Sequence, residues 1–141
     1  MWSKRRRGFS LVEFMMVLAL MAMLAGVVVL SVRPILTLGK QRTARAEIAT
    51  ICSALENFYS VHGRYPTSDE GVTILTQKTD KLSEGLLQGL PVDPWGQEYH
   101  YTCPGRSGRP YDVICYGGDG REGGSGADED VTSWKLKEVT K

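Results

Sequence analysis

The sequence predicts an α+β fold, in which one long N-terminal helix packs through its C-terminal half on a small antiparallel sheet. Three observations lead to this prediction. An uncharged stretch, residues 14–31, follows a basic cluster near the N-terminus. Beyond residue 39, apolar residues recur at three- and four-residue steps. The last third of the chain contains short β-branched and aromatic runs separated by glycine and proline.

The uncharged stretch is long enough to cross a membrane as one helix. About 20 apolar residues span a bilayer core, whereas a secretory signal peptide has only about 7–15 apolar residues before a small-residue cleavage site. The basic cluster Lys4–Arg7 precedes the stretch, so the N-terminus should stay in the cytoplasm while the rest is exported. We therefore expect a membrane-spanning helix over residues 9–36 and an exported domain over residues 37–141.

One carboxylate, Glu13, lies at the start of this helix. A charge in a membrane segment costs on the order of several kcal/mol unless a partner compensates it. Its presence therefore indicates a specific partner.

The exported half of the helix is amphipathic. Its apolar positions at helical spacing are Ile48, Ile51, Cys52, Leu55, Phe58 and Tyr59. The helix should end at His62, because Gly63 can adopt the left-handed conformation that follows many helices. Thr67 and Glu70 have the spacing of a capping box, which predicts a short helix through Leu75.

Two strands are predicted at residues 97–102 and 111–116, around a turn at residues 104–109. A turn-rich segment, residues 91–96, leads into them. A final short strand is predicted at residues 131–136. Together these strands form the small antiparallel sheet.

Composition restricts the kind of protein. The chain has 141 residues, which corresponds to one domain plus its anchor. Removal of residues 1–8 would leave 13 basic and 16 acidic residues, a net charge of −3. We expect no nucleic-acid partner, because no basic face survives that removal. We also expect no enzyme, since no nucleophile, acid and base set emerges.

Three cysteines, Cys52, Cys103 and Cys115, lie in the exported part. None forms a CxxC pair, which gives a zinc site little support. Export permits a disulfide, and Cys103 and Cys115 flank the predicted hairpin. A simple register would not place them directly opposite each other, so a bonded and a free pair both remain open. Cys52 is expected to stay reduced and packed.

A glycine-rich acidic loop follows the second strand. Its carboxylates are Asp119, Asp128, Glu129 and Asp130. It matches the glycine spacing of a dinucleotide loop, but no helix can start after it to hold a pyrophosphate. Carboxylates on a flexible loop favour calcium instead, and a solvated acidic loop is the alternative.

The N-terminal residues Arg7-Gly8-Phe9-Ser10-Leu11-Val12-Glu13-Phe14 resemble the class III leader junction of type IV pilins and pseudopilins. This resemblance implies that a prepilin peptidase cuts between Gly8 and Phe9 and methylates Phe9. Residues 1–8 would then be the cleaved leader. The new α-amino group of one subunit could pair with Glu13 of a neighbour inside the membrane.

An ordered series of motifs makes the chain similar to the major pseudopilins of type II secretion. The series comprises Tyr65-Pro66-Thr67, Gly71, Asp93-Pro94-Trp95-Gly96, Tyr99, Pro104-Gly105, Tyr111-Asp112-Val113, Gly118-Asp119-Gly120, Glu122-Gly123-Gly124 and Asp130-Val131-Thr132-Ser133-Trp134. The resemblance implies a type IV pilin-like fold and a structural subunit of the periplasmic pseudopilus. It also implies calcium bound by the side chains of Asp119, Asp128 and Asp130 and by the carbonyls of Tyr116 and Arg121.

The same resemblance implies partners and a location. The subunit would form a helical homopolymer and meet minor pseudopilins, the prepilin peptidase and an inner-membrane assembly platform. It would cross the inner membrane once, with its C-terminal domain in the periplasm. Two alternatives remain: a type IV pilus or competence pilin, and a monomeric membrane-anchored exported binding domain or enzyme.

Overall fold

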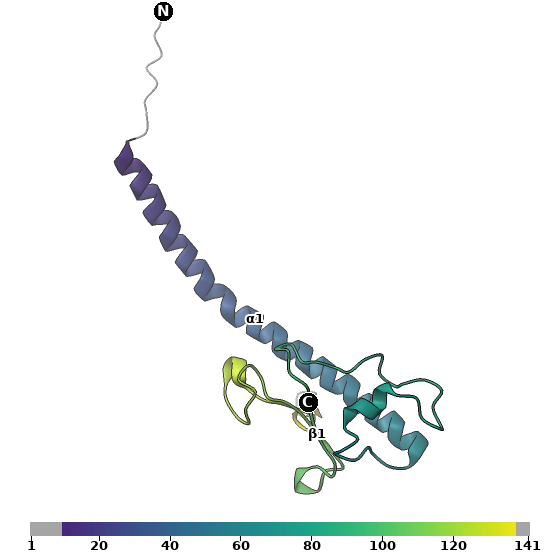
Figure 1. Cartoon of the computed structure of the whole chain (residues 1–141). Helices are drawn as coiled ribbons and strands as arrows, with labels where there is room; N and C mark the ends of the chain where they lie inside the picture. The colour runs from purple at the N-terminus through teal and green to yellow at the C-terminus, as the bar shows by residue number, and fades with distance from the viewer. Residues whose placement is uncertain (1–9, 138–141) are drawn as a thin grey trace, which may run out of the picture. The chain divides into compact units, whose positions relative to one another are not determined.

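The computed structural model describes residues 10–137, without the side chains of residues 27–35 and 137. The chain divides into two compact units, Met1–Leu36 and Thr37–Lys141. We call residues 10–36 the N-terminal segment and residues 37–137 the domain. Helix α1, Leu11–His62, supplies the whole N-terminal segment except its first residue and continues into the domain (Figure 1).

Every described apolar side chain between Leu11 and Leu24 in the N-terminal segment is exposed. The large apolar side chains between Leu11 and Leu24 are 49% to 75% exposed. Within the part of the chain that the structure describes, no helix is both long and apolar enough to cross a membrane. The predicted span includes residues 9 and 27–35, which lie outside the described side chains.

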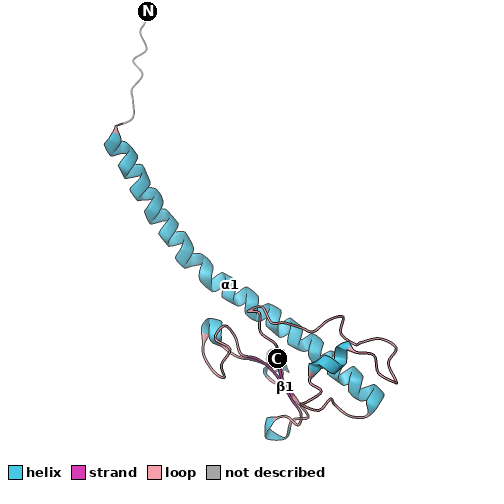
Figure 2. Cartoon of the chain, viewed as in Figure 1, coloured by secondary structure: helices cyan, strands magenta, loops and turns pink. Residues whose placement is uncertain are grey.

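A three-stranded antiparallel sheet forms the centre of the domain (Figure 2). Its order is β1 (His100–Thr102), β2 (Asp112–Cys115) and β3 (Val131–Thr132). Short 3-10 helices lie between and around the strands: η1 (Val72–Thr76), η2 (Arg106–Gly108), η3 (Gly126–Asp128) and η4 (Lys135–Lys137). The α+β fold predicted from the sequence is therefore confirmed.

The core forms where α1 packs on the sheet. Ile48, Ile51, Leu55 and Phe58 are 0–1% exposed and belong to the same apolar cluster as Val113 of β2. Their spacing of three and four residues places them on one side of the helix. Leu75 of η1 completes this side of the core at 1% exposure. The amphipathic pattern therefore predicted Ile48, Ile51, Leu55 and Phe58 correctly. It was wrong for Tyr59, which is 46% exposed, and Cys52 is only partly buried.

Local signals also fix the end of α1. Gly63 follows with φ of 74°, and its amide donates to the Tyr59 carbonyl at 2.7 Å. The capping box forms as predicted, since the Thr67 amide donates to Glu70 Oε2 at 2.7 Å and the Glu70 amide to Thr67 Oγ1 at 3.2 Å. The box opens a turn, and a 3-10 helix follows it in place of an α-helix.

The three strands are shorter than predicted. β3 has two residues because the chain turns at Ser133 and Trp134 and then enters η4, although the Ser133 amide still donates to the Val113 carbonyl of β2 at 2.9 Å. In the first hairpin, His100 lies opposite Ile114 and Thr102 opposite Asp112.

Of the two states left open for Cys103 and Cys115, the structure contains the free pair. Cys103 lies next to Thr102 at the turn end of the hairpin, whereas Cys115 lies beyond Ile114 at the opposite end. The antiparallel register therefore separates the two sulfurs. The Cys103 thiol instead donates to the Pro110 carbonyl at 3.4 Å.

Candidate functional site

A capping box begins α1 at the residues that the leader motif singled out. The Ser10 amide donates to Glu13 Oε2 at 2.9 Å, and the Val12 amide donates to Ser10 Oγ at 3.3 Å. These bonds satisfy backbone donors that the start of a helix leaves without intrahelical partners. A carboxylate in the first turn also interacts favourably with the helix dipole.

Glu13 therefore has a partner within its own chain, a role that the sequence interpretation missed. The signal was available, because Ser10-Leu11-Val12-Glu13 has the S-x-x-E spacing of a capping box. Gly8 and Phe9, the predicted cleavage and methylation residues, lie outside the described residues.

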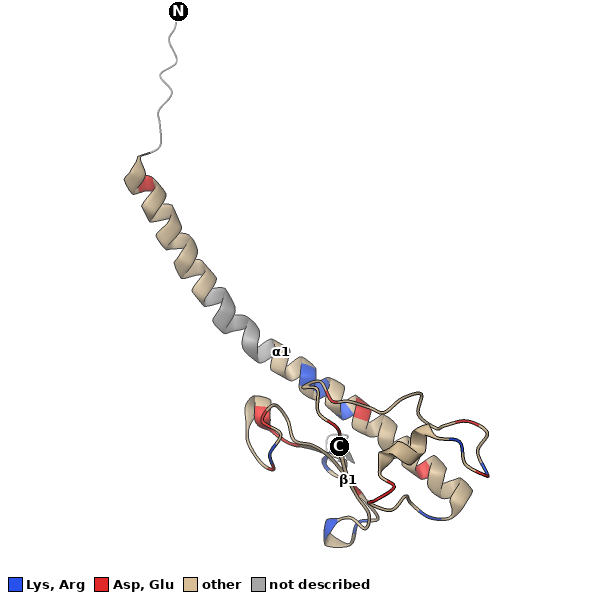
Figure 3. Cartoon of the chain, in the orientation of Figure 1, with Lys and Arg blue, Asp and Glu red and all other residues tan. Residues whose placement is uncertain are grey.

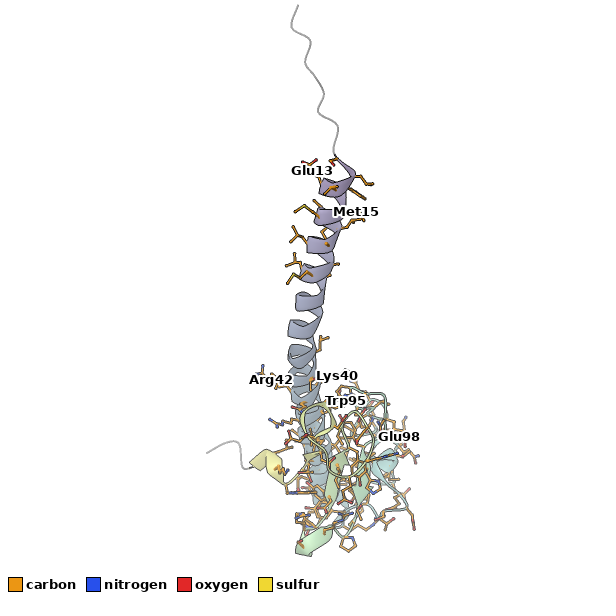
Figure 4. All side chains as sticks on the ribbon, turned by 90° about the vertical axis from the view of Figure 1, so that its left-hand side faces the viewer. Glu13, Met15, Lys40, Arg42, Trp95 and Glu98 are labelled. Atoms are coloured by element: carbon orange, nitrogen blue, oxygen red, sulfur yellow. The ribbon has the colours of Figure 1, made fainter. Side chains whose placement is uncertain are left out.

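The apolar side chains around Glu13 form an exposed surface that no described part of the chain covers. Figure 4 labels Glu13 and Met15 on this helix, where Met15 is 63% exposed. Soluble monomers rarely expose a contiguous apolar patch of this extent. The arrangement suits contact with lipid or with other apolar helices, and one carboxylate is its only described charge (Figure 3).

In the domain, the Asp93-Pro94-Trp95-Gly96 turn is closed by a buried carboxylate. Asp93 Oδ1 accepts the amides of Trp95 at 2.9 Å and Gln97 at 2.8 Å. Cys115 of β2 donates its thiol to Asp93 Oδ2 at 3.1 Å. Burial raises the pKa of the Cys115 thiol to about 12, so this sulfur stays protonated and can donate. The turn is thereby fastened to the middle strand.

A second buried carboxylate, Asp112, holds the hairpin turn. Its two oxygens accept Arg109 Nε at 2.6 Å and Arg109 Nη2 at 3.0 Å. The Arg106 amide adds a bond of 2.8 Å. The hydrogen bonds from Arg109 chiefly hold the pKa of Asp112 below its usual value, although burial opposes them. The guanidinium of Arg109 also lies 4.1 Å from the centre of the Trp134 ring.

The acidic loop, residues 117–130, folds back on itself. The Gly118 amide donates to the Ala127 carbonyl at 3.0 Å, and a side chain on Gly118 would place its Cβ 2.8 Å from Asp128 Oδ1. Gln41 of α1 donates its amide to the Gly126 carbonyl. Glycine at position 118 therefore allows the two ends of the loop to pack closely. The bond from Gln41 connects the loop to α1.

The predicted calcium ligands lie in this loop in different environments. Asp119 Oδ1 accepts the Arg121 amide at 3.1 Å, and Asp130 Oδ2 accepts the Gly123 amide at 2.8 Å. The other oxygen of Asp130 is buried without a hydrogen-bond partner among the described residues. A buried carboxylate oxygen of this kind fits a cation.

The structure does not gather the predicted calcium ligands into one group. Across residues 10–137, no group of three or more His, Cys, Asp or Glu side chains is arranged to hold a metal ion. Asp119, Asp128 and Asp130 are thus not gathered around one point, and calcium remains a prediction supported by the unpartnered oxygen of Asp130.

A leading apolar helix joined to a small antiparallel sheet defines the class of pilin-like proteins. The N-terminal sequence agrees with this class, because a family model described as "Prokaryotic N-terminal methylation motif" matches residues 3–29. A second family model, "Type II secretion system (T2SS), protein G", matches residues 34–134. The chain belongs to this type II secretion protein G family.

Curated relatives agree over nearly the full length. "Type II secretion system core protein G" of Pseudomonas aeruginosa is 35% identical, covering 95% of this chain and 99% of the relative. The protein of the same description from Vibrio cholerae is 32% identical, covering 96% of each.

A solved structure confirms the fold. The crystal structure of the major pseudopilin from the type 2 secretion system of enterohaemorrhagic Escherichia coli matches with a TM-score of 0.56 and 25% identity. The match covers 69% of this chain and 88% of that one. The resemblance drawn from the sequence is therefore confirmed.

Proposed function

We propose that the chain is a structural subunit of a type II secretion pseudopilus, anchored in the inner membrane before assembly with its domain in the periplasm. The observation that carries this proposal is the exposed apolar surface of the N-terminal segment, 49% to 75% exposed at its large side chains. In the membrane this surface faces lipid, and in a filament it faces the same surface of other subunits. Its role is mechanical, and catalysis forms no part of it.

Glu13 sets the register of assembly in this proposal. A methylated Phe9 amine of one subunit would pair with Glu13 of its neighbour, and each charge makes the other tolerable in apolar surroundings. Glu13→Gln keeps the shape and some hydrogen bonding but removes the charge. We expect normal membrane insertion and a strongly reduced filament yield when cells expressing the variant are sheared and fractionated.

The matched control is Glu98→Gln, which removes an exposed carboxylate from the domain. It should assemble as the wild type does. Wild-type filament yield from Glu13→Gln would show that charge pairing does not set the register.

Processing at Gly8 by a prepilin peptidase is the second part of the proposal. Gly8→Val should block cleavage, because a bulky residue prevents close approach of the backbone at the cut. Gly39→Val is the control, since a Cβ at Gly39 meets nothing within 4 Å. The intact mass of membrane-extracted protein reports cleavage after Gly8 and methylation of Phe9 together. A Gly8→Val chain that matures normally would place the cut elsewhere.

Calcium is the third part. We propose that the side chains of Asp119, Asp128 and Asp130 hold one calcium ion, with the carbonyls of Tyr116 and Arg121 completing its shell. The ion would neutralise carboxylates that repel one another and order the glycine-rich loop. The buried, unpartnered oxygen of Asp130 supports this proposal.

Thermal melting of the full chain in detergent tests the calcium proposal. At a calcium concentration 100 times the dissociation constant, binding to the folded form alone adds about 2.7 kcal/mol of stability. The chain should melt at a higher temperature with calcium than with chelator, and Asp119→Ala should abolish the difference. Asp69→Ala, which removes an exposed carboxylate outside the loop, should preserve it. Equal melting of the wild type in both conditions would leave the loop as a solvated surface.

The proposed partners follow from assembly. They are further copies of the chain in a helical homopolymer, minor pseudopilins, the prepilin peptidase and an inner-membrane assembly platform. The family relationship and the methylation motif support this set.

A further inference from the structure

One end of the domain carries three exposed cations that no described carboxylate neutralises. Lys40, Arg42 and Arg45 lie on α1, and none of them forms an ion pair within the described part of the chain. We call these three residues the basic collar. Elsewhere in the domain, ion pairs form at Arg64–Glu70, Arg106–Glu122 and Arg109–Asp112, whereas Lys78, Arg121 and Lys135 form none among the described residues. The collar differs from those cations by its place on α1 beside exposed apolar surface.

The collar follows directly on apolar surface. Leu38, two residues before Lys40, is 55% exposed. With a rise of about 1.5 Å per residue, the three cations lie about 3 to 10 Å beyond Leu38 along the helix. The headgroup layer on each side of a bilayer is about 5–8 Å thick, and long basic side chains extend further. Cations at this depth reach lipid headgroups when the apolar surface occupies the hydrocarbon core.

An aromatic residue lies beside the collar. Lys40 Nζ is 5.6 Å from the centre of the Trp95 ring, and Figure 4 shows both residues at one end of the domain. The Asp93 carboxylate fixes the backbone beneath Trp95 through its bond of 2.9 Å to the Trp95 amide. Tryptophan is enriched at membrane interfaces, because its ring is apolar and its N–H is polar.

We propose that the basic collar and Trp95 dock the domain on anionic phospholipid headgroups while the subunit is stored in the membrane; the inference rests on the proposed function. The order of chemistry along the chain favours lipid over an acidic face of a second copy. Exposed apolar residues come first, then cations beside an aromatic ring, which is the order of the layers in a bilayer. No acidic residue occurs between positions 14 and 46.

Docking gives the collar a defined role in assembly. The contact holds the domain against the membrane before the subunit is extracted, and extraction breaks it. The attraction is electrostatic, so it acts within about 10 Å at 0.1 M salt and weakens at higher salt.

Energy transfer from tryptophan to a dansyl-headgroup lipid measures this docking. The full chain carries Trp2→Phe, so that only Trp95 and Trp134 act as donors, and is placed in lipid nanodiscs. We expect greater transfer in discs that contain phosphatidylglycerol than in discs of phosphatidylcholine alone. The difference should disappear in about 1 M salt, where the screening length falls to about 3 Å.

A matched pair of variants assigns the effect to the collar. Arg42→Gln with Arg45→Gln removes two collar charges and leaves Lys40 on Trp95. At the usual strength of a basic residue near an anionic surface, the ratio of docked to undocked domains should fall ~30-fold. Lys78→Gln with Lys135→Gln removes two exposed cations outside the collar and should retain the lipid-dependent transfer.

Each other outcome overturns the docking. Equal transfer in both lipids for the wild type, or equal losses in both double variants, excludes the collar as a lipid contact. If Arg42→Gln with Arg45→Gln kept the lipid-dependent transfer but lost filament assembly, the collar would contact a second copy of the chain and not lipid. Flotation separates this failure from that of the proposed function: a chain that does not float with vesicles refutes membrane storage, whereas one that floats without lipid-dependent transfer refutes docking alone.

Discussion

The N-terminal segment and the domain differ in how far the apolar side chains of α1 are exposed. In the domain, one face of α1 packs its apolar residues against the same chain, and Leu55 is 0% exposed. In the N-terminal segment the same kind of residue faces outward, and Leu18 is 51% exposed. One helix therefore carries a region whose partners are encoded in the chain and a region whose partners lie outside it. Stability measurements should report the first region, and assembly measurements the second.

The sharpest comparison uses two leucines of the same helix. Leu55→Ala should destabilise the domain by about 2–5 kcal/mol, because it removes buried methyl groups and leaves a cavity. Leu18→Ala should change the free energy of unfolding by less than about 0.5 kcal/mol. Urea unfolding of the full chain in detergent measures both. Similar losses would mean that the N-terminal segment is part of the folded core.

Asp112 offers a test by acid. Its folded pKa lies below its unfolded value, so its stabilising contribution is complete above about pH 4 and is lost as pH falls through the folded pKa. Asp112→Asn should lower the free energy of unfolding by about 1–3 kcal/mol at pH 7. The difference from the wild type should become smaller as pH falls below about 4. Melting curves between about pH 2 and 7 measure this. If the difference in stability between the wild type and Asp112→Asn did not change with pH, the charge on Asp112 would not be its cause.

Ser10→Ala addresses the other region. The variant removes the hydroxyl that caps α1 and should cost about 1 kcal/mol of local helix stability. Amide exchange at residues 11–14 should accelerate, while the melting temperature of the domain stays unchanged. A shift in that melting temperature would show that the start of α1 is coupled to the core.

The cysteines give the smallest expected effect. Cys103→Ser should alter unfolding by at most about 0.5 kcal/mol, because no disulfide is lost. Cys115 is 0% exposed and its pKa is raised to about 12, so alkylation should reach it only through unfolding. Mass spectrometry after timed alkylation measures both thiols. Rapid labelling of Cys115 in the native chain would contradict its burial.

Local patterns in the sequence predicted most of the domain. Gly63 marked the end of α1, and the spacing of Thr67 and Glu70 predicted two hydrogen bonds that the structure contains. These signals work because each one acts within a few residues. The side of α1 that packs on the sheet was readable for the same reason.

Contacts between distant residues could not be read in this way. The bond from Cys115 to Asp93 joins residues 22 positions apart, and no local pattern connects them. The length of β3 depended on the turn at Ser133, which weak alternation in the sequence did not show. At the N-terminus the pattern of the Ser10–Glu13 capping box was visible, but the leader motif drew attention to a different role for the same carboxylate.

The capping box at Ser10 and Glu13 gives two backbone amides at the start of α1 hydrogen-bond partners within the chain. Backbone donors at a helix start depend on water when no side chain serves them, and apolar surroundings supply none. Here two of these donors are served by the chain itself, at 2.9 Å and 3.3 Å. These two donors therefore need no new partners when this end of the helix passes from lipid into a protein environment.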